Sequence, residues 1–98
     1  MTKEQIKWFW EKCGLTYFDG WFYSPEGERL FEYGAPIDIW ALPYLFKYAV
    51  PKLHFYIIKM IWVGIWVVSI NDSFKQWVAE DKDPAIALFW AIYKALGE

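Results

Sequence analysis

The sequence predicts an α+β fold, in which a three-stranded antiparallel meander is packed by helices. A segment near each end of the chain has the capping residues and apolar spacing of a helix. The β-branched and aromatic run between them, residues 53–80, is divided by two turns. Both faces of the strands in that run are apolar, so something must cover each face. Helices on both sides, or one helix layer plus a partner, would meet this requirement.

The length of 98 residues predicts a single domain, 1–98. Of these residues 57% are hydrophobic and 23% are aromatic, whereas a chain this short buries only about 60–65% of its unfolded surface. The apolar supply therefore exceeds what one small core needs. We expect some rings to lie at a partner surface, a membrane or a second packed layer.

The first helix is predicted over residues 3–13. Thr2 and Gln5 have the spacing of a capping box, in which each side chain bonds the backbone of the other. Apolar residues follow on one stripe, at Ile6, Phe9, Trp10 and Cys13. Gly14 stands where a glycine ends a helix.

Residues 15–34 predict a small hairpin or an ordered aromatic loop. Asp19-Gly20 lies between Tyr17-Phe18 and Trp21-Phe22-Tyr23, which is a short-range hairpin signal. A second turn is predicted at residues 24–27, where serine, proline and glycine favour reversal of the chain.

A middle helix is predicted over residues 38–50, with Asp38 as its N-cap. Pro43 lies inside this range, so either the helix kinks there or its regular part begins near Pro43. Pro51 forces the preceding residue out of the helical region and ends the element.

Three strands are predicted after it, at residues 53–62, 65–70 and 74–80. Gly64 marks the first turn and Asn71-Asp72-Ser73 the second. Because these connections are short, neighbouring strands must be antiparallel.

The last helix is predicted over residues 84–96. Asp83 is its N-cap, Pro84 occupies the first helical position, and Gly97 follows as the stop. Trp90 lies off the apolar face, which comprises Ala85, Leu88, Phe89, Ile92, Tyr93 and Leu96.

Three segments carry a family resemblance: 9–14 (FWEKCG), 45–53 (LFKYAVPKL) and 83–92 (DPAIALFWAI). They resemble the phage ABA sandwich domain family, which comprises small proteins of phages and prophages. The resemblance implies an α-β-α sandwich, in agreement with the two apolar faces of the meander. It implies no activity, and no catalytic or ligand residues can be carried over.

The charged and nucleophilic residues exclude several classes of function. The net charge of −2, the single arginine Arg29 and the scattered lysines argue against nucleic-acid binding. Cys13 and His54 are the only thiol and imidazole; Cys13 falls at a helix C-terminus, where the dipole disfavours a thiolate. One histidine and one cysteine are too few for a metal site. We assign no catalytic, metal-binding or cofactor-binding residue and predict that the chain is not an enzyme.

The aromatic residues are the remaining candidates for function. They either cap the core or form a protein-binding patch, because tryptophan and tyrosine are favoured interface anchors. The sequence leaves both interpretations open, with some rings in each role, and stacking of an exposed tryptophan on carbohydrate is a third alternative. The candidate protein-binding residues are Trp21, Phe22, Tyr23, Phe31, Tyr33, Trp40 and Trp90.

Residues 53–70 form the most hydrophobic segment and give an alternative prediction. A membrane-spanning helix needs about 20 apolar residues, and the uncharged run after Lys59 is about half that length. Lys59 would add a cost of about 2.5–3.5 kcal/mol. We therefore predict strands in this segment and retain a membrane-associated protein as the alternative.

The function predicted from these observations is that of a small phage or prophage accessory protein that binds another protein. The partner would be a host or phage protein, for example an anti-phage defence factor inhibited in the manner of an anti-CRISPR. A homo-oligomer formed through the sheet or Trp90 would also use the apolar excess. The single cysteine excludes an internal disulfide and favours the cytoplasm of the host cell. An uncharacterised enzyme is the third alternative.

Overall fold

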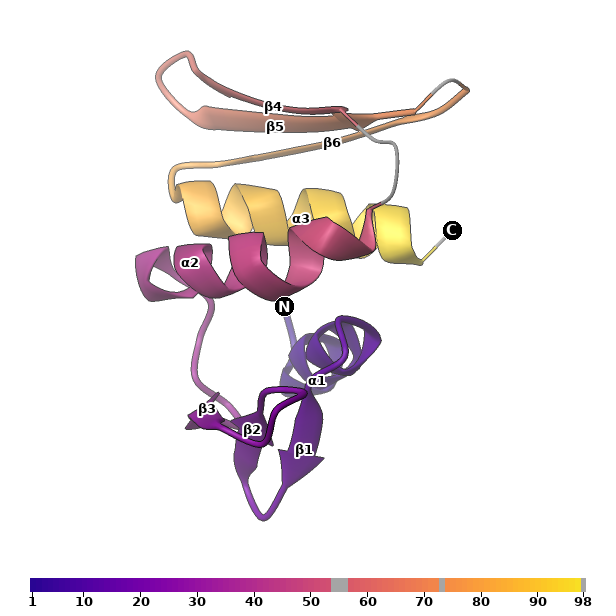
Figure 1. The fold of residues 1–98 in the computed structure, drawn as a ribbon. Helices are drawn as coiled ribbons and strands as arrows, with labels where there is room; N and C mark the ends of the chain where they lie inside the picture. Colours follow the sequence, from indigo (N-terminus) through magenta and orange to yellow (C-terminus); the bar gives the residue numbers. More distant parts are fainter. Residues whose placement is uncertain (54–56, 73, 98) are drawn as a thin grey trace. The chain divides into compact units, whose positions relative to one another are not determined.

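The computed structural model describes residues 1–53, 57–72 and 74–97, and it divides the chain into two compact units, Met1–Pro36 and Ile37–Glu98 (Figure 1). Each unit contains a three-stranded antiparallel sheet and at least one helix. The α+β class and the helix-packed meander predicted from the sequence are confirmed. That the whole chain behaves as one domain stays a prediction.

The first unit begins with helix α1 (Lys3–Lys12), one residue shorter than predicted. Its capping box is formed as expected. The Gln5 N–H donates to Thr2 Oγ1 at 3.1 Å, and the Thr2 N–H donates to Gln5 Oε1 at 2.8 Å. Cys13 is the C-cap. The helix buries a face of Ile6, Phe9 and Trp10.

Three short strands follow: β1 (Thr16–Phe18), β2 (Trp21–Tyr23) and β3 (Arg29–Glu32). The predicted hairpin is confirmed, and β3 adds a strand that the sequence did not indicate. Asp19 and Gly20 connect β1 to β2 with φ angles of 50° and 83°, a left-handed pair of the kind that tight hairpins require.

One face of this sheet belongs to the core of the first unit. Phe22 and Phe31 are directly opposite each other in β2 and β3, with ring centroids 5.4 Å apart. The Trp10 ring of α1 lies 5.0 Å from Phe31. Because successive strand residues point to opposite faces, the neighbours of Phe22 in β2, Trp21 and Tyr23, point away from this core.

The second unit begins with an irregular helical segment where the sequence predicts a helix over 38–50. It consists of η1 (Ile39–Ala41), α2 (Leu42–Tyr44), the π-helix η2 (Leu45–Ala49) and η3 (Val50–Lys52). Asp38 caps it, accepting the Trp40 N–H at 3.2 Å. Prolines in α2 and η3 remove two backbone donors, which explains why the hydrogen bonding changes along the segment.

The second sheet contains β4 (Ile57–Trp62), β5 (Trp66–Asn71) and β6 (Gln76–Asp81) in that order, all antiparallel. Leu53 ends η3, so the first strand begins later than predicted. Residues 54–56 of the predicted range 53–62, His54 among them, lie outside the described residues, as does Ser73 of the second predicted turn. The other two strands are each shifted by one or two residues from the predicted ranges.

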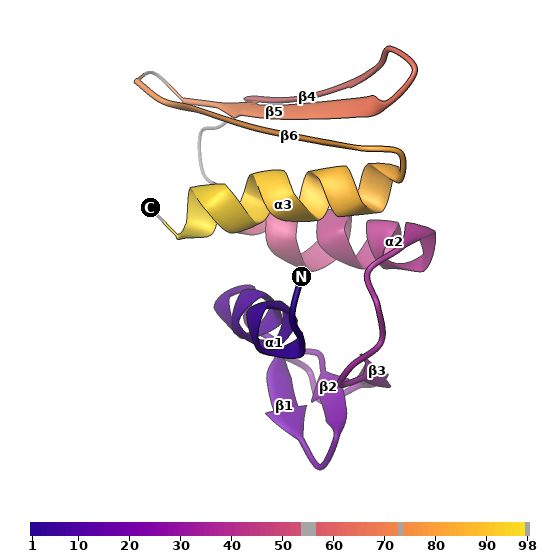
Figure 2. The ribbon, with the colours of Figure 1, turned by 180° about the vertical axis from the view of Figure 1, so that it is seen from behind.

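Helix α3 (Pro84–Leu96) has the predicted boundaries. Asp83 Oδ1 accepts the Ala85 N–H at 2.7 Å and the Ile86 N–H at 3.4 Å. Figures 1 and 2 show α3 between the sheet and the helical segment that contains α2. Four of the side chains of β5 and β6 that point toward α3 are buried: Val68, Ile70, Trp77 and Ala79.

The helices of this unit therefore lie on one face of the meander, and the opposite face has exposed side chains. This corresponds to the second arrangement left open by the sequence, a helix layer on one side with the other side free for a partner. Of the hydrophobic segment 53–70, residues Ile57–Trp62 and Trp66–Ile70 are strands. Among the described residues, no helix has the length and apolar character needed to cross a membrane.

Candidate functional site

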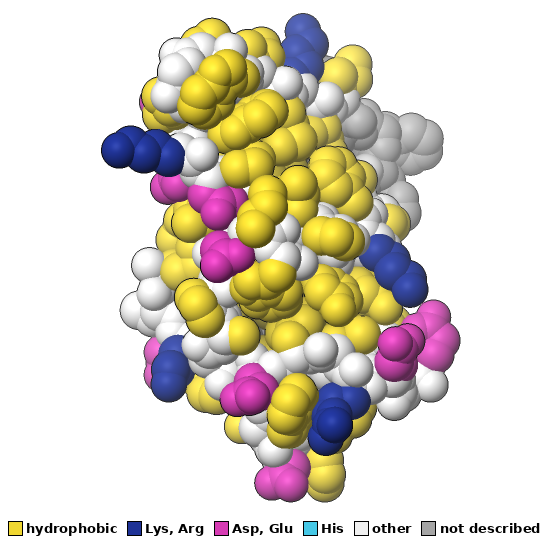
Figure 3. Space-filling view, turned by 90° about the vertical axis from the view of Figure 1, so that its left-hand side faces the viewer, with side chains coloured by type: hydrophobic (Ala, Val, Ile, Leu, Met, Phe, Trp, Pro, Cys, Tyr) yellow, Lys and Arg dark blue, Asp and Glu magenta, His cyan; other side chains and the backbone are white. Residues whose placement is uncertain are grey.

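Large hydrophobic side chains remain exposed in both units, and Figure 3 shows such side chains over much of one side of the surface. In the first unit they gather on the outward face of the β1–β3 sheet. Phe18 is directly opposite Trp21, and Thr16 is directly opposite Tyr23. Phe18 is 68% exposed, while Trp21 and Tyr23 are half-buried. We call Phe18, Trp21 and Tyr23 the aromatic face.

One cation is part of this surface. The Arg29 guanidinium lies over the Trp21 ring, 4.4 Å from its centroid. Arg29 is opposite Tyr23 in the sheet, and Glu32 is opposite Trp21. The arginine therefore holds the indole in place by a cation–π contact, and it leaves Phe18 and Tyr23 as the rings open to a ligand.

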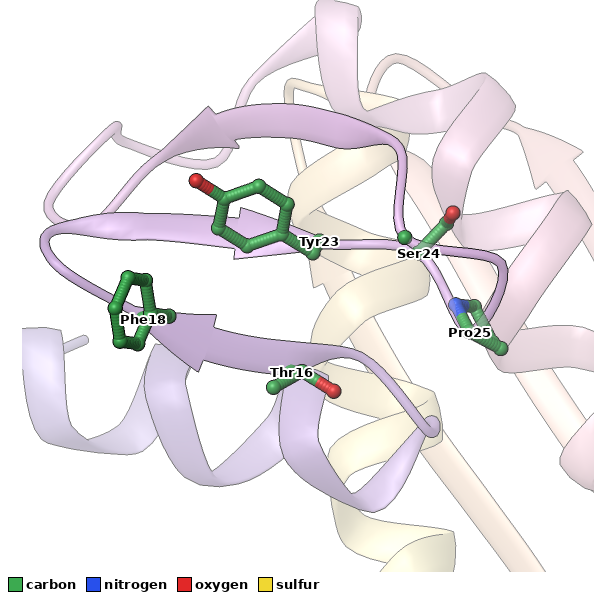
Figure 4. A pocket seen from close by; sticks show the side chains of 6 residues that line it. Thr16, Phe18, Tyr23, Ser24 and Pro25 are labelled. Atoms are coloured by element: carbon green, nitrogen blue, oxygen red, sulfur yellow. The ribbon is translucent and has the colours of Figure 1, made fainter.

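A pocket of about 380 Å³ lies between these two rings. Figure 4 shows Phe18 and Thr16 on one strand, Tyr23 on the next, and Ser24 and Pro25 just beyond the end of β2. The Thr16 side chain is smaller than the rings of Phe18 and Tyr23, so it forms the floor of the pocket between them. The pocket can accept an apolar side chain flanked by aromatic walls.

The turn at one end of the pocket is held by its own hydrogen bonds. Ser24 is buried, and its Oγ accepts the Glu28 N–H at 3.0 Å. The Ser24 N–H donates to the Glu28 carbonyl at 2.8 Å, and the Gly27 N–H donates to the Ser24 carbonyl at 2.9 Å. Gly27 has a φ of 92°, which strongly favours glycine. The pocket end is thus pre-formed.

The charge of this sheet is negative. Residues 16–32 contain four carboxylates, Asp19, Glu26, Glu28 and Glu32, and one guanidinium, which gives a formal charge of −3. Asp19 follows Phe18 directly, and Glu26 lies between the pocket residues Pro25 and Gly27. A ligand at the aromatic face therefore meets an acidic rim.

The structure separates the candidate residues of the first unit into two groups. Trp21 and Tyr23 point outward, as a binding role requires. Phe22 is fully buried and Phe31 nearly so, because they alternate onto the face that packs on α1. Their assignment to a protein-binding patch is corrected: they are core residues.

Tyr33 lies between these groups. It is half-buried, with its ring 5.2 Å from Tyr17 and 6.4 Å from Phe22. Partial burial, followed by the nearby charges of Glu4 and Tyr17, raises the pKa of Tyr33 above its ordinary value. The contact of its ring with the buried Phe22 places Tyr33 on the packed side of the sheet.

The two remaining candidates, Trp40 and Trp90, lie in the second unit, whereas the aromatic face lies in the first. Trp40, in η1, is half-buried with its ring 5.9 Å from Tyr44. Trp90 is half-buried on α3, 5.1 Å from Phe89 and 5.2 Å from Tyr93. Both rings thus have packing contacts within their own helical segments.

Phe18 and Arg29 were not among the binding residues predicted from the sequence. A two-residue Asp19-Gly20 turn places the residues on either side of it opposite each other, so Phe18 could have been paired with Trp21 from the sequence. Arg29 could not, because β3 had no strand pattern to place it.

The structure assembles no alternative chemistry from the described residues. Cys13 is buried, and His54 lies outside the described ranges. In residues 1–53, 57–72 and 74–97, no group of three His, Cys, Asp or Glu side chains could hold a metal ion. The absence of catalysis stays a prediction.

Comparison with protein-family models, with curated proteins and with solved structures found no match for this chain. The resemblance to the phage ABA sandwich domain family therefore stays a prediction.

Proposed function

We propose that this chain acts by binding another protein through the aromatic face. The observation that carries the proposal is Phe18, which is 68% exposed beside Tyr23 and a pocket between them. Leaving a phenylalanine in water forgoes about 1.5–3 kcal/mol of burial. Covering it with a partner recovers much of this energy, which is why exposed aromatic clusters mark protein interfaces.

The acidic rim defines the chemistry of the partner. A formal charge of −3 on residues 16–32 attracts a basic segment and repels an acidic one. The pocket between Phe18 and Tyr23 accepts one apolar side chain. The partner segment therefore combines an apolar anchor with lysine or arginine on either side of it.

The family resemblance supplies the biological setting of this proposal. A small phage or prophage protein acts in the cytoplasm of the infected or lysogenic host cell, on a host or phage protein. A defence factor is one such target, since nucleic-acid-handling enzymes present basic surfaces. An acidic aromatic face would block such a surface by occupying it, and no catalytic step is needed.

Site-specific photo-crosslinking in the host cell tests this proposal. A p-benzoyl-phenylalanine placed at position 18 reports on what covers the aromatic face. The matched control carries the same group at position 74, because Phe74 is 95% exposed and belongs to the second unit. We expect a discrete protein adduct from position 18 that position 74 does not give.

A second arm tests the charge argument. We expect the yield of the adduct to fall as ionic strength rises from about 0.05 M to 0.5 M in lysate, because salt screens the acidic rim. Equal adducts from both positions, or no adduct from position 18 in host cells, would contradict the proposed function.

A further inference from the structure

The outward face of the second sheet is a separate surface that the proposed function does not use. Its three rows follow from the strand register: Ile57, Asn71 and Gln76; then Lys59, Ser69 and Val78; then Ile61, Val67 and Glu80. Ile57 is 62% exposed and Ile61 is 51% exposed. We call these nine residues the open face.

The open face carries one charge of each sign. Lys59 lies on the edge strand β4 and Glu80 on the opposite edge strand β6, and both are exposed. They are two strands and one row apart, which separates their Cα atoms by about 12 Å. In the part of the chain that the structure describes, no salt bridge joins Lys59 to Glu80, so each remains available to a charge from outside.

We propose that the occupant of the open face is a second copy of this chain, packed face to face about a two-fold axis. An axis in the interface plane, crossing β5 between Val67 and Ser69, exchanges the positions of Lys59 and Glu80. Each lysine then lies opposite Glu80 of the second copy, so the interface contains two ion pairs. Ile61 then lies close to Val67 of the second copy.

This arrangement is consistent with the known geometry of stacked sheets. The axis makes the strands of the two copies cross at about 70°, which is near the orthogonal class of sheet packing. A two-fold interface requires a surface that complements itself. One lysine, one glutamate and four aliphatic side chains meet this requirement, whereas a partner of strong single-sign charge would leave one of the two ions unpaired.

Pairing at the strand edges is less favourable than pairing through the face. The Lys94 ammonium donates to the Val78 carbonyl of edge strand β6 at 2.7 Å. Lys59 lies on edge strand β4, where lysine disfavours addition of another strand. Both edges are thus protected by lysines, while the aliphatic centre of the open face is uncovered.

The size of the open face sets the expected affinity. Three strands and three rows cover about 15 Å by 20 Å with side chains included. The area of this patch is well below the roughly 800 Å² that each partner buries in a standard interface. We therefore expect a weak, concentration-dependent dimer with a dissociation constant on the order of 100 μM.

A charge-swap cycle followed by sedimentation equilibrium tests this inference. The proteins are the wild type, Lys59→Glu, Glu80→Lys and the double variant, each from about 5 μM to about 500 μM. Each single swap opposes like charges twice per dimer, so we expect at least a tenfold weakening of self-association. The double swap restores both pairs and returns the dissociation constant to within about threefold of the wild type.

Circular dichroism verifies that each exposed substitution leaves the fold intact. A Phe18→Ser variant serves as the second control, and it should dimerise like the wild type. A wild type that is monomeric over the whole range, or a double variant as weak as the single ones, would overturn the inference. Neither result bears on the photo-crosslinking at position 18, so the two proposals can fail independently.

Discussion

The chain contains two three-stranded antiparallel meanders whose outward faces differ in residue type and charge. In each, one face packs against a helix and the other faces outward. The outward face of β1–β3 gathers aromatic rings beside a pocket in a segment of charge −3. The outward face of β4–β6 carries aliphatic side chains and one charge of each sign. The first surface is complementary to something unlike itself, and the second is complementary to itself.

This difference shows why apolar exposure alone does not define a partner. Phe18 and Ile57 are exposed to a similar degree, and burial of either would be favourable. The surrounding charges distinguish the two surfaces, because they determine which approaching surface is repelled. Variants that each remove one feature of one region separate these contributions.

The largest expected effect comes from the cores beneath the two sheets. Phe89 in α3 and Trp10 in α1 are both fully buried. Replacing either by alanine leaves a large cavity, so we expect each variant to lose about 3–5 kcal/mol of unfolding free energy. Chemical denaturation measures this loss. A change below about 1 kcal/mol for either variant would contradict the packing described for its unit.

The same experiment tests the single-domain prediction. If the chain unfolds as one domain, both variants shift a single transition to lower denaturant concentration. Two separate transitions, each moved by only one variant, would instead show two domains that correspond to Met1–Pro36 and Ile37–Glu98.

The next effect concerns recognition rather than stability. Phe18→Ala removes the most exposed ring of the aromatic face, so the affinity for the crosslinked partner should fall by at least about tenfold. The free energy of unfolding should change by less than about 0.5 kcal/mol, because the ring is mostly in water. Phe74→Ala is the matched control, and it should alter neither quantity. A similar loss of affinity in both variants would show that the aromatic face is not the surface that recognises the partner.

A smaller effect is expected at the N-cap of α3. Asp83 accepts two backbone N–H groups, and Asp83→Ala leaves them without that acceptor. We expect a loss of about 1 kcal/mol in thermal or chemical unfolding. Asp83→Asn retains an acceptor oxygen and should recover most of it. An alanine variant as stable as the wild type would show that the cap contributes nothing to α3.

The smallest effect is a pH dependence at the turn between β5 and β6. Asp72 Oδ1 accepts the Phe74 N–H at 2.7 Å and the Lys75 N–H at 2.6 Å. These bonds, that from Phe74 first, lower the pKa of Asp72 below its ordinary value of 3.8. At acid pH the unfolded chain therefore takes up a proton before the folded chain does. The contribution is complete above the ordinary value and is lost as pH falls through the lowered one.

Asp72→Asn checks this dependence, because an amide keeps an acceptor oxygen but does not titrate. The stability difference between wild type and variant should be largest near pH 6 and should shrink toward pH 3. A difference that is constant over this range would mean that the Asp72 carboxylate does not act through its charge.

The elements that could be predicted from the sequence are those with local causes. Helix α3 has the predicted boundaries because its N-cap, its proline and its terminal glycine are all within the segment itself. The Asp19-Gly20 turn was likewise predictable, because its left-handed φ angles depend on those two residues. In both cases the chain adopts locally what its tertiary structure also requires.

The elements that were missed depend on contacts distant in sequence. Strand β3 has no clear alternation and forms because Phe31 packs on Phe22 and Trp10. The middle helix was predicted over residues 38–50 with a kink at Pro43 or a regular part beginning near it, but two prolines and its packing on α3 divide it into several helix types. The face of β4–β6 that is covered depends on the side on which α3 packs after β6. The sequence could not predict that side, because both faces of the strands are apolar.

The most direct test of the comparison is the molar mass at high concentration, measured by sedimentation equilibrium on Phe18→Ser and Lys59→Glu beside the wild type. If the two outward faces serve different partners, the Phe18 variant self-associates as the wild type does, and the Lys59 variant self-associates at least about tenfold more weakly. Equal self-association of all three, or loss of it in the Phe18 variant alone, would contradict the account.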